Sequence, residues 1–63
     1  MFVYIVTLNT RYGLDVVPFD SEQKALIFAD NFAKEFYGTD NHEQVNEITN
    51  YIDSVTITES EIK

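Results

Sequence analysis

The sequence predicts an α+β fold in which one long amphipathic helix packs on a small antiparallel sheet. Two runs rich in β-branched and aromatic residues, 2–8 and 14–19, predict strands near the start of the chain. Apolar residues at helical spacing predict a helix over 21–37, and strict alternation predicts a third strand over 54–59. A weaker helical pattern lies between residues 39 and 53. The expected order is therefore strand, strand, helix, short helix, strand.

Residues 9–13, Asn-Thr-Arg-Tyr-Gly, join the first two strands and predict a hairpin connection, because Asn and Gly tolerate positive φ. One interpretation of Arg11 and Tyr12 is that both are plain exposed loop residues, with Arg11 paired to Asp15. The other is that they form a contact point, because Arg and Tyr are enriched at interface hot spots. Pro18 cannot donate a ladder hydrogen bond, so we expect it at an edge or at the end of its strand.

The long helix has recognisable signals at both ends. Asp20 is the expected N-cap, with Gln23 three residues later, and Gly38 is the expected stop. The residues predicted to face the sheet recur every three or four positions: Ala25, Phe28, Ala29, Phe32 and Phe36. Four further residues widen this apolar stripe beyond what a small sheet can cover: Leu26, Ile27, Ala33 and Tyr37.

The short helix is predicted from three apolar residues, with Asp40 as its cap and Glu43 as the partner of that cap: Val45, Ile48 and Ile52. His42, the only histidine, is expected to be solvated near the start of this helix. A structural metal site normally needs four ligands, and the chain has no second histidine and no cysteine. We therefore expect neither a metal nor any other cofactor.

The chain has 63 residues and a net charge of −7, and we expect residues 1–63 to form one acidic domain. A domain of this length buries only about 60% of the surface that its unfolded chain exposes. A second subunit is therefore a natural source of stability. The first strand is apolar on both faces, and the helix stripe is broad, so we expect a homodimer.

Most of the negative charge lies in the second half of the chain, where residues 38–62 carry six acids and no base. Such a surface repels phosphates, so we expect a basic protein partner, one that handles nucleic acid, and no direct binding to nucleic acid or membrane. Together with Arg11 and Tyr12, the expected partner-binding residues are these acids: Asp40, Glu43, Glu47, Asp53, Glu59 and Glu61. The alternative is that the acids serve only solubility.

The stretch YIVTLNTRYGLDV, residues 4–16, is followed by a capped amphipathic helix. This opening resembles small uncharacterised proteins, several of them phage-encoded, that share a strand, an R-Y-G-x-D-V-like hairpin and a helix. The resemblance covers about the first half of the chain and implies no established activity. For a phage-encoded protein it implies the cytoplasm of the host cell.

Catalysis is not expected, because the serines have no plausible His–Asp partners and two glycines cannot build a phosphate-binding loop. The start of the chain lacks the features of a secretion signal, and its apolar runs are too short to span a membrane, so we expect a cytoplasmic protein. The favoured function is a non-catalytic inhibitor or modulator that mimics nucleic-acid phosphates. The rival is a homo-oligomeric structural or interaction module whose acids only keep it soluble.

Overall fold

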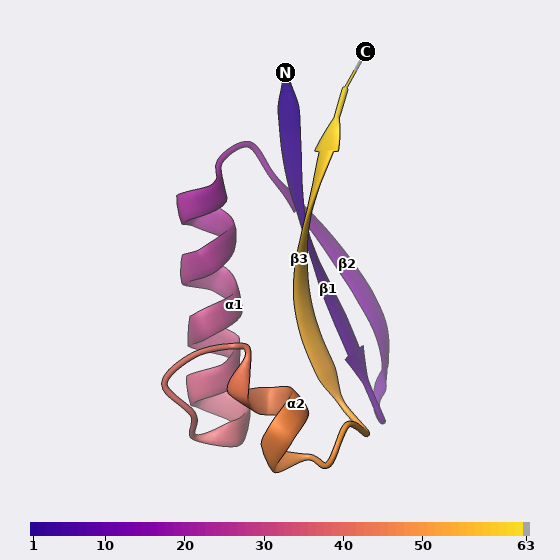
Figure 1. Ribbon diagram of the computed structural model, residues 1–63, viewed down its shortest axis with the longest axis vertical. Coiled ribbons are helices and arrows are strands. Elements are labelled where there is room, and N and C mark those ends of the chain that lie inside the picture. The colour runs from indigo at the N-terminus through magenta and orange to yellow at the C-terminus, as the bar shows by residue number, and fades with distance from the viewer. Residues whose placement is uncertain (63) are drawn as a thin grey trace.

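The computed structural model describes residues 1–62 and has the predicted α+β architecture. The five elements follow the expected order: β1 (Phe2–Thr10), β2 (Gly13–Phe19), α1 (Glu22–Tyr37), α2 (Gln44–Ile48) and β3 (Ser54–Glu61). Both helices lie on one side of the sheet, and Met1 and Ile62 lie side by side at the end opposite α2, joined by a hydrogen bond of 2.8 Å from the Ile62 N–H to the Met1 carbonyl (Figure 1).

The sheet is antiparallel throughout, with the strand order β2-β1-β3. Thr10 pairs with Gly13, so only two residues connect β1 to β2, fewer than the five-residue connection predicted. Pro18 lies within β2, which is an edge strand, as its missing N–H requires. In β1 the even-numbered side chains face the helices, and the odd-numbered ones face the opposite side of the sheet.

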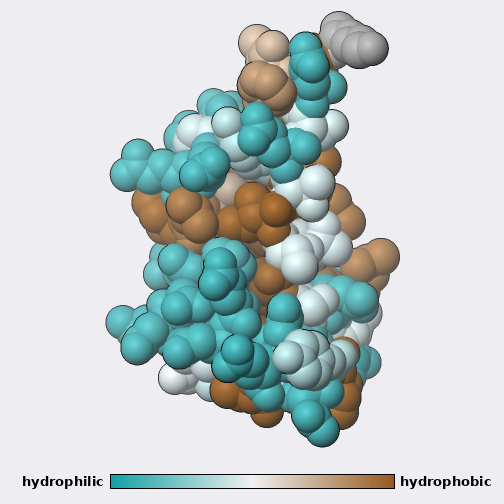
Figure 2. Space-filling view, viewed as in Figure 1, coloured by the Kyte–Doolittle hydropathy of each residue, from teal (hydrophilic) through white to brown (hydrophobic). Residues whose placement is uncertain are grey.

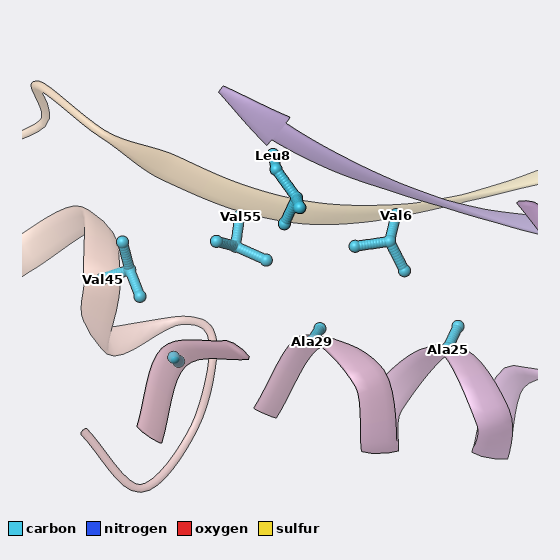
Figure 3. Close-up of a cluster of buried hydrophobic side chains, with 7 residues drawn as sticks. Val6, Leu8, Ala25, Ala29, Val45 and Val55 are labelled. Atoms are coloured by element: carbon cyan, nitrogen blue, oxygen red, sulfur yellow. The ribbon is translucent and has the colours of Figure 1, made fainter. Parts of the chain in front are cut away.

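The buried core is small, and alanines form its helical side. Its members are Val6, Leu8, Ala25, Ala29, Ala33, Val45 and Val55. The three alanines recur every four residues and line the surface of α1 that meets β1 and β3 (Figure 3). A methyl group is the smallest side chain with a Cβ, so this surface lets the helix approach the strands closely. Bulkier residues lie to the sides, where Phe19 and Phe28 pack with ring centroids 5.2 Å apart.

The caps of both helices differ from the prediction by one or more residues. Ser21, not Asp20, is the N-cap of α1, because Ser21 has the extended backbone and its Oγ accepts a hydrogen bond from the Lys24 N–H. Asp20 instead forms an exposed ion pair with Lys24 at 3.0 Å, and this contact lowers the pKa of the Asp20 carboxyl. Gly38 ends α1 with φ 68°, as predicted.

Asp40 does not cap α2. The first N–H groups of this helix are instead bound by Asn41, whose Oδ1 accepts hydrogen bonds of 3.0 Å from Glu43 and 3.2 Å from Gln44. The Asp40 N–H in turn donates to the side-chain oxygen of Gln44 at 2.9 Å. The predicted reciprocal capping pair therefore exists, but the amide side chains of Asn41 and Gln44 form it in place of Asp40 and Glu43. The Asp40 carboxylate is left exposed.

The two faces of the sheet differ in cover. The face carrying Val6 and Leu8 is buried under α1 and α2. On the opposite face Val3 and Ile5 are half-buried between neighbouring strands, and no element among residues 1–62 lies over them. Within the described chain, β1 is therefore covered by helices on one side, and its other side is left uncovered. Neither of the described helices has the length and hydrophobicity needed to cross a lipid bilayer.

The close contact between α1 and the sheet gives a first prediction. Ala29 is fully buried, so replacing it by Leu forces extra volume into a packed contact and should lower the free energy of unfolding by about 1–3 kcal/mol. Asn31→Leu adds the same side chain at an exposed position of α1 and serves as the control. Urea unfolding followed by circular dichroism measures both. Equal stability of the two variants would contradict the packing described here.

Candidate protein-binding site

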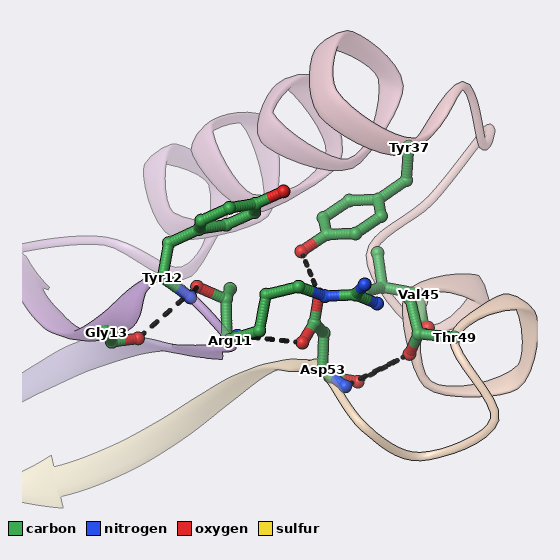
Figure 4. A network of polar contacts seen from close by, with 8 residues as sticks. Arg11, Tyr12, Gly13, Tyr37, Val45, Thr49 and Asp53 are labelled. Carbon is green, nitrogen blue, oxygen red and sulfur yellow. Dashed lines mark hydrogen bonds and ion pairs between the residues drawn. The ribbon is translucent and has the colours of Figure 1, made fainter.

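Asp53 is buried, with 1% of its surface exposed. Its Oδ1 accepts a hydrogen bond of 2.9 Å from the Arg11 N–H, and its Oδ2 accepts one of 2.8 Å from the Tyr37 hydroxyl. The Nε of Arg11 lies 3.5 Å from Oδ2 and adds an ion pair (Figure 4). The prediction that Asp53 belongs to an exposed acidic surface is therefore wrong, because its oxygens are used inside the protein.

The hairpin tip is shaped so that Arg11 reaches Asp53. Thr10 Oγ1 accepts a hydrogen bond of 3.2 Å from the Tyr12 N–H and donates one of 3.3 Å to the Gly13 carbonyl. Gly13 has φ 136°, in the region that favours glycine. The predicted pairing of Arg11 with Asp15 is wrong. The tight turn directs Arg11 to Asp53, the residue before β3, whereas Tyr12 is 89% exposed.

The polar network changes the pKa of the Asp53 carboxyl and of the Tyr37 hydroxyl. Burial alone would raise the pKa of Asp53, but the hydrogen bonds from Tyr37 and the Arg11 N–H, with the nearby guanidinium charge, hold that pKa below its usual value. Burial raises the pKa of Tyr37 to about 12, with the hydrogen bond to the Asp53 carboxylate acting in the same direction. At neutral pH the network therefore contains a carboxylate, a guanidinium and a neutral phenol.

A left-handed turn delivers Asp53 to this position. Asn50 and Tyr51 have φ values of 57° and 65°, which is uncommon for two consecutive residues with side chains. On either side of them the chain is tied down by Thr49, whose Oγ1 donates to the Val45 carbonyl at 2.6 Å and accepts from the Asp53 N–H at 3.2 Å. The strained turn persists because these contacts fix both of its ends.

An open pocket of about 720 Å³ lies beside the network, between the hairpin tip, the end of α1 and α2. Its walls are largely aromatic and aliphatic, with Arg11 and Asp53 at the polar end: Leu8, Tyr12, Phe32, Phe36, Tyr37 and Ile48. Asp15 also lines it. Figure 4 shows the Tyr12 and Tyr37 rings on separate elements, one on the hairpin and one on α1. We call this feature the aromatic pocket.

The aromatic pocket exposes large apolar side chains. Phe36 is 67% exposed and Ile48 is 55% exposed, in addition to Tyr12. The prediction that Phe36 faces the core is wrong, although Phe36 lies on the same side of α1 as Ala29 by helical rotation. The twisted sheet diverges from the last turn of α1 (Figure 1). Phe36 therefore lines the pocket instead of packing on a strand. Phe32 contacts Phe36 with ring centroids 4.7 Å apart and remains half-buried.

The remaining predicted acids are all exposed: Asp40, Glu43, Glu47, Glu59 and Glu61. The structure brings Glu43 and Glu59 together with Glu22, because all three line a second groove of about 310 Å³ whose apolar lining includes Leu26 and Ile57. Figure 2 shows a hydrophobic band between two hydrophilic areas on one face of the molecule. Glu22 was not among the predicted residues, because its position beside β3 depends on how α1 packs.

His42 also lines this groove, and the prediction that it is solvated is wrong. Its side chain is largely buried, and Nδ1 lies 2.8 Å from Asp30 Oδ1, which also accepts a hydrogen bond of 3.0 Å from the His42 N–H. Burial would raise the pKa of Asp30, but these hydrogen bonds hold it below its usual value. Within residues 1–62 no group of three or more His, Asp or Glu side chains could hold a metal ion.

The residues of α1 that line the site were all assigned to the apolar helix stripe from the sequence: Phe32, Phe36 and Tyr37. Their spacing gives the same signal as core residues, so only the three-dimensional position of the hairpin distinguishes them. The partner of Asp53 is 42 residues away in the chain. One signal in the sequence pointed to this contact: the chain has only four Lys and Arg residues, so few side chains other than Arg11 could pair with a buried acid.

The hydroxyl of Tyr37 gives a second prediction. Tyr37→Phe removes a hydrogen bond to a buried carboxylate and should lower the free energy of unfolding by about 1–2 kcal/mol, measured by urea denaturation. Tyr12→Phe makes the same chemical change on an exposed ring and should leave stability unchanged. A loss of equal size in both variants would show that the Tyr37 hydroxyl has no special structural role.

The lowered pKa of Asp53 gives a third prediction. A carboxyl whose pKa is lower in the folded than in the unfolded chain stabilises the fold above the usual value of 3.8, and this contribution disappears as the pH falls through the folded pKa. Asp53→Asn should therefore be less stable than the wild type at neutral pH, and the difference should shrink at acid pH. Asp15→Asn, at an exposed position, is the control for the charge change. A difference between wild type and Asp53→Asn that is constant with pH would contradict this linkage.

Comparison of the chain with protein-family models, curated proteins and solved structures found no significant match.

Proposed function

We propose that this chain is a non-catalytic binding protein that captures a basic protein partner. Its aromatic pocket receives an apolar or aromatic side chain of the partner. Its exposed acids favour partners whose contact surface is positively charged. The partner class that fits best is a protein that handles nucleic acid, which the chain inhibits or modulates by occupying a basic groove. The observation that carries the proposal is the open pocket that leaves Tyr12, Phe36 and Ile48 exposed.

The composition of the pocket supports a contact site. Large aromatic residues and Arg are enriched among the residues that contribute most to binding, particularly where they surround a pocket. Arg11 and Tyr12 lie on a two-residue turn whose hydrogen bonds hold it rigid, so little conformational entropy is lost when a partner binds. Exposing such side chains raises the risk of aggregation for a monomer, and a bound partner removes that risk.

The charge of the molecule supports a basic partner. Glu22, Glu43 and Glu59 border an apolar groove, so a partner with basic residues around an apolar one would match both components. Opposite charge increases the rate of encounter, and like charge excludes acidic partners. Carboxylates on a rigid scaffold can also occupy a groove that otherwise binds phosphates, which is the basis for proposing inhibition.

The alternative function is a homo-oligomeric interaction module whose acids serve only solubility. One observation favours it, namely the sheet face that no element within residues 1–62 covers. The two functions use different surfaces, so variants of one surface leave the other intact.

The experiment begins with the immobilised chain and a cell lysate, followed by calorimetry and stopped-flow kinetics with the purified captured protein. Tyr12→Ala and Phe36→Ala should each weaken binding by about tenfold or more. A second variant replaces five exposed acids by amides, and it should associate more slowly and lose most of its salt dependence. Its substitutions are D40N, E43Q, E47Q, E59Q and E61Q.

The control is Tyr51→Ala, which removes an exposed aromatic ring outside the aromatic pocket and should not change affinity. If the amide variant binds as tightly and as fast as the wild type at low salt, the acids serve only solubility.

Duplex DNA added to the complex should displace the chain from its partner. Simultaneous binding of DNA and chain would contradict phosphate mimicry, and equal capture by wild type and all variants would contradict the binding function.

A further inference from the structure

We infer that a second copy of this chain docks on the open face of the sheet, the face opposite α1 and α2, to form a symmetric dimer of two stacked sheets. This surface is separate from the aromatic pocket, which lies on the helix side of the sheet. The inference therefore does not depend on the proposed function.

Within residues 1–62 the strands place no charged side chain on the open face. Strand register places five apolar side chains on it: Val3, Ile5, Leu14, Val16 and Pro18. The positions of β3 on the same face are Ser or Thr, which include Thr56 and Thr58. About a quarter of the residues in the chain are charged. The charged residues within the three strands are Asp15, Glu59 and Glu61, and all of them lie on the helix side of the sheet. The solvent-exposed face of an antiparallel sheet ordinarily carries polar and charged side chains, so the absence of charge on the strands here indicates that this face is covered.

The charge of the whole molecule identifies the occupant. A basic partner would gain nothing from a neutral face, because its charges would be drawn to the acids on the other surfaces. A second copy carries −7 itself, so contact through an acidic surface would bring like charges close together, whereas contact through the open face would not. Two copies can therefore meet at this face without burying carboxylates, and a two-fold dimer requires such a self-complementary surface.

The edges of the sheet point to face-to-face stacking rather than to a continuous sheet across two copies. Pro18 lies on one edge strand, and the other edge strand ends with Glu59 and Glu61. Proline and charge on edge strands are the usual means by which proteins prevent edge pairing. Both edges are thus protected, whereas Leu14 and Val16 remain 64% and 57% exposed on the face between them.

The size of the face indicates a reversible dimer. Three strands spaced about 4.8 Å apart and about seven residues long cover a flat area of roughly 350 Å², which side-chain relief increases. Stable interfaces bury about 800 Å² on each partner, and interfaces well below that are weak or transient. We therefore expect monomer and dimer to exchange, with the dimer dominant only at high protein concentration.

The experiment is sedimentation equilibrium of the full chain from low micromolar to millimolar concentration. The wild type should shift from monomer to dimer mass. Val16→Lys should weaken the dimer by about tenfold or more, because it places a cation within an apolar interface. Ile27→Lys is the matched control, since it replaces a β-branched residue of similar exposure, 53%, on the helix side. Thr58→Lys repeats the test at a position that is already polar, and circular dichroism confirms that each variant is folded.

Salt separates this inference from the proposed function. Added salt screens the repulsion between two acidic copies, so it should strengthen the dimer, whereas it should weaken binding to a basic partner. A wild type that stays monomeric at millimolar concentration overturns the inference. So does equal weakening by Val16→Lys and Ile27→Lys, or a dimer unaffected by both Val16→Lys and Thr58→Lys. None of these results changes the expected affinity for a basic partner.

Discussion

The buried carboxylate of Asp53 is the contact on which the rest of the site depends. It joins three segments that are distant in the chain: the hairpin tip through Arg11, the last turn of α1 through Tyr37, and the start of β3 through its own backbone. A domain of 63 residues has little apolar core, here formed largely by alanine and valine. A polar network with all its hydrogen bonds made can supply the specificity of geometry that such a core lacks.

The same contact explains why the aromatic pocket is open. Arg11 and Tyr37 hold the hairpin and the helix at a separation set by the carboxylate between them, while the sheet twists away from the end of α1. α2 fills part of that space with Val45, and the remainder is bordered by Tyr12 and Phe36. The exposed aromatic rings therefore follow from the way the fold is closed, and a partner can use them without any rearrangement of the scaffold.

The sequence was sufficient for the elements and insufficient for the contacts between distant residues. Alternation and helical spacing are local signals, and they identified every strand and helix in the right order. They could not show that Asp53 is buried, since a carboxylate in an acidic run looks solvated until its partner, far away in the chain, is known. The same applies to His42, whose contact with Asp30 joins the loop before α2 to α1. Phe36 was misassigned for a related reason, because helical spacing gives a direction but not what lies in that direction.

These contacts determine which charges remain on the surface. Asp53 and Arg11 neutralise each other inside the protein, so the net charge of −7 is carried by ten other acids and three lysines. Within residues 1–62 the charged side chains of the strands all lie off the open face of the sheet, while Glu22, Glu43 and Glu59 gather around one groove on the helix side. Solubility alone would be served by acids spread over every surface, including the open face. Separation into one neutral and one acidic side instead leaves the molecule with two surfaces of different chemistry, and the proposed dimer and the proposed basic partner each depend on one of them.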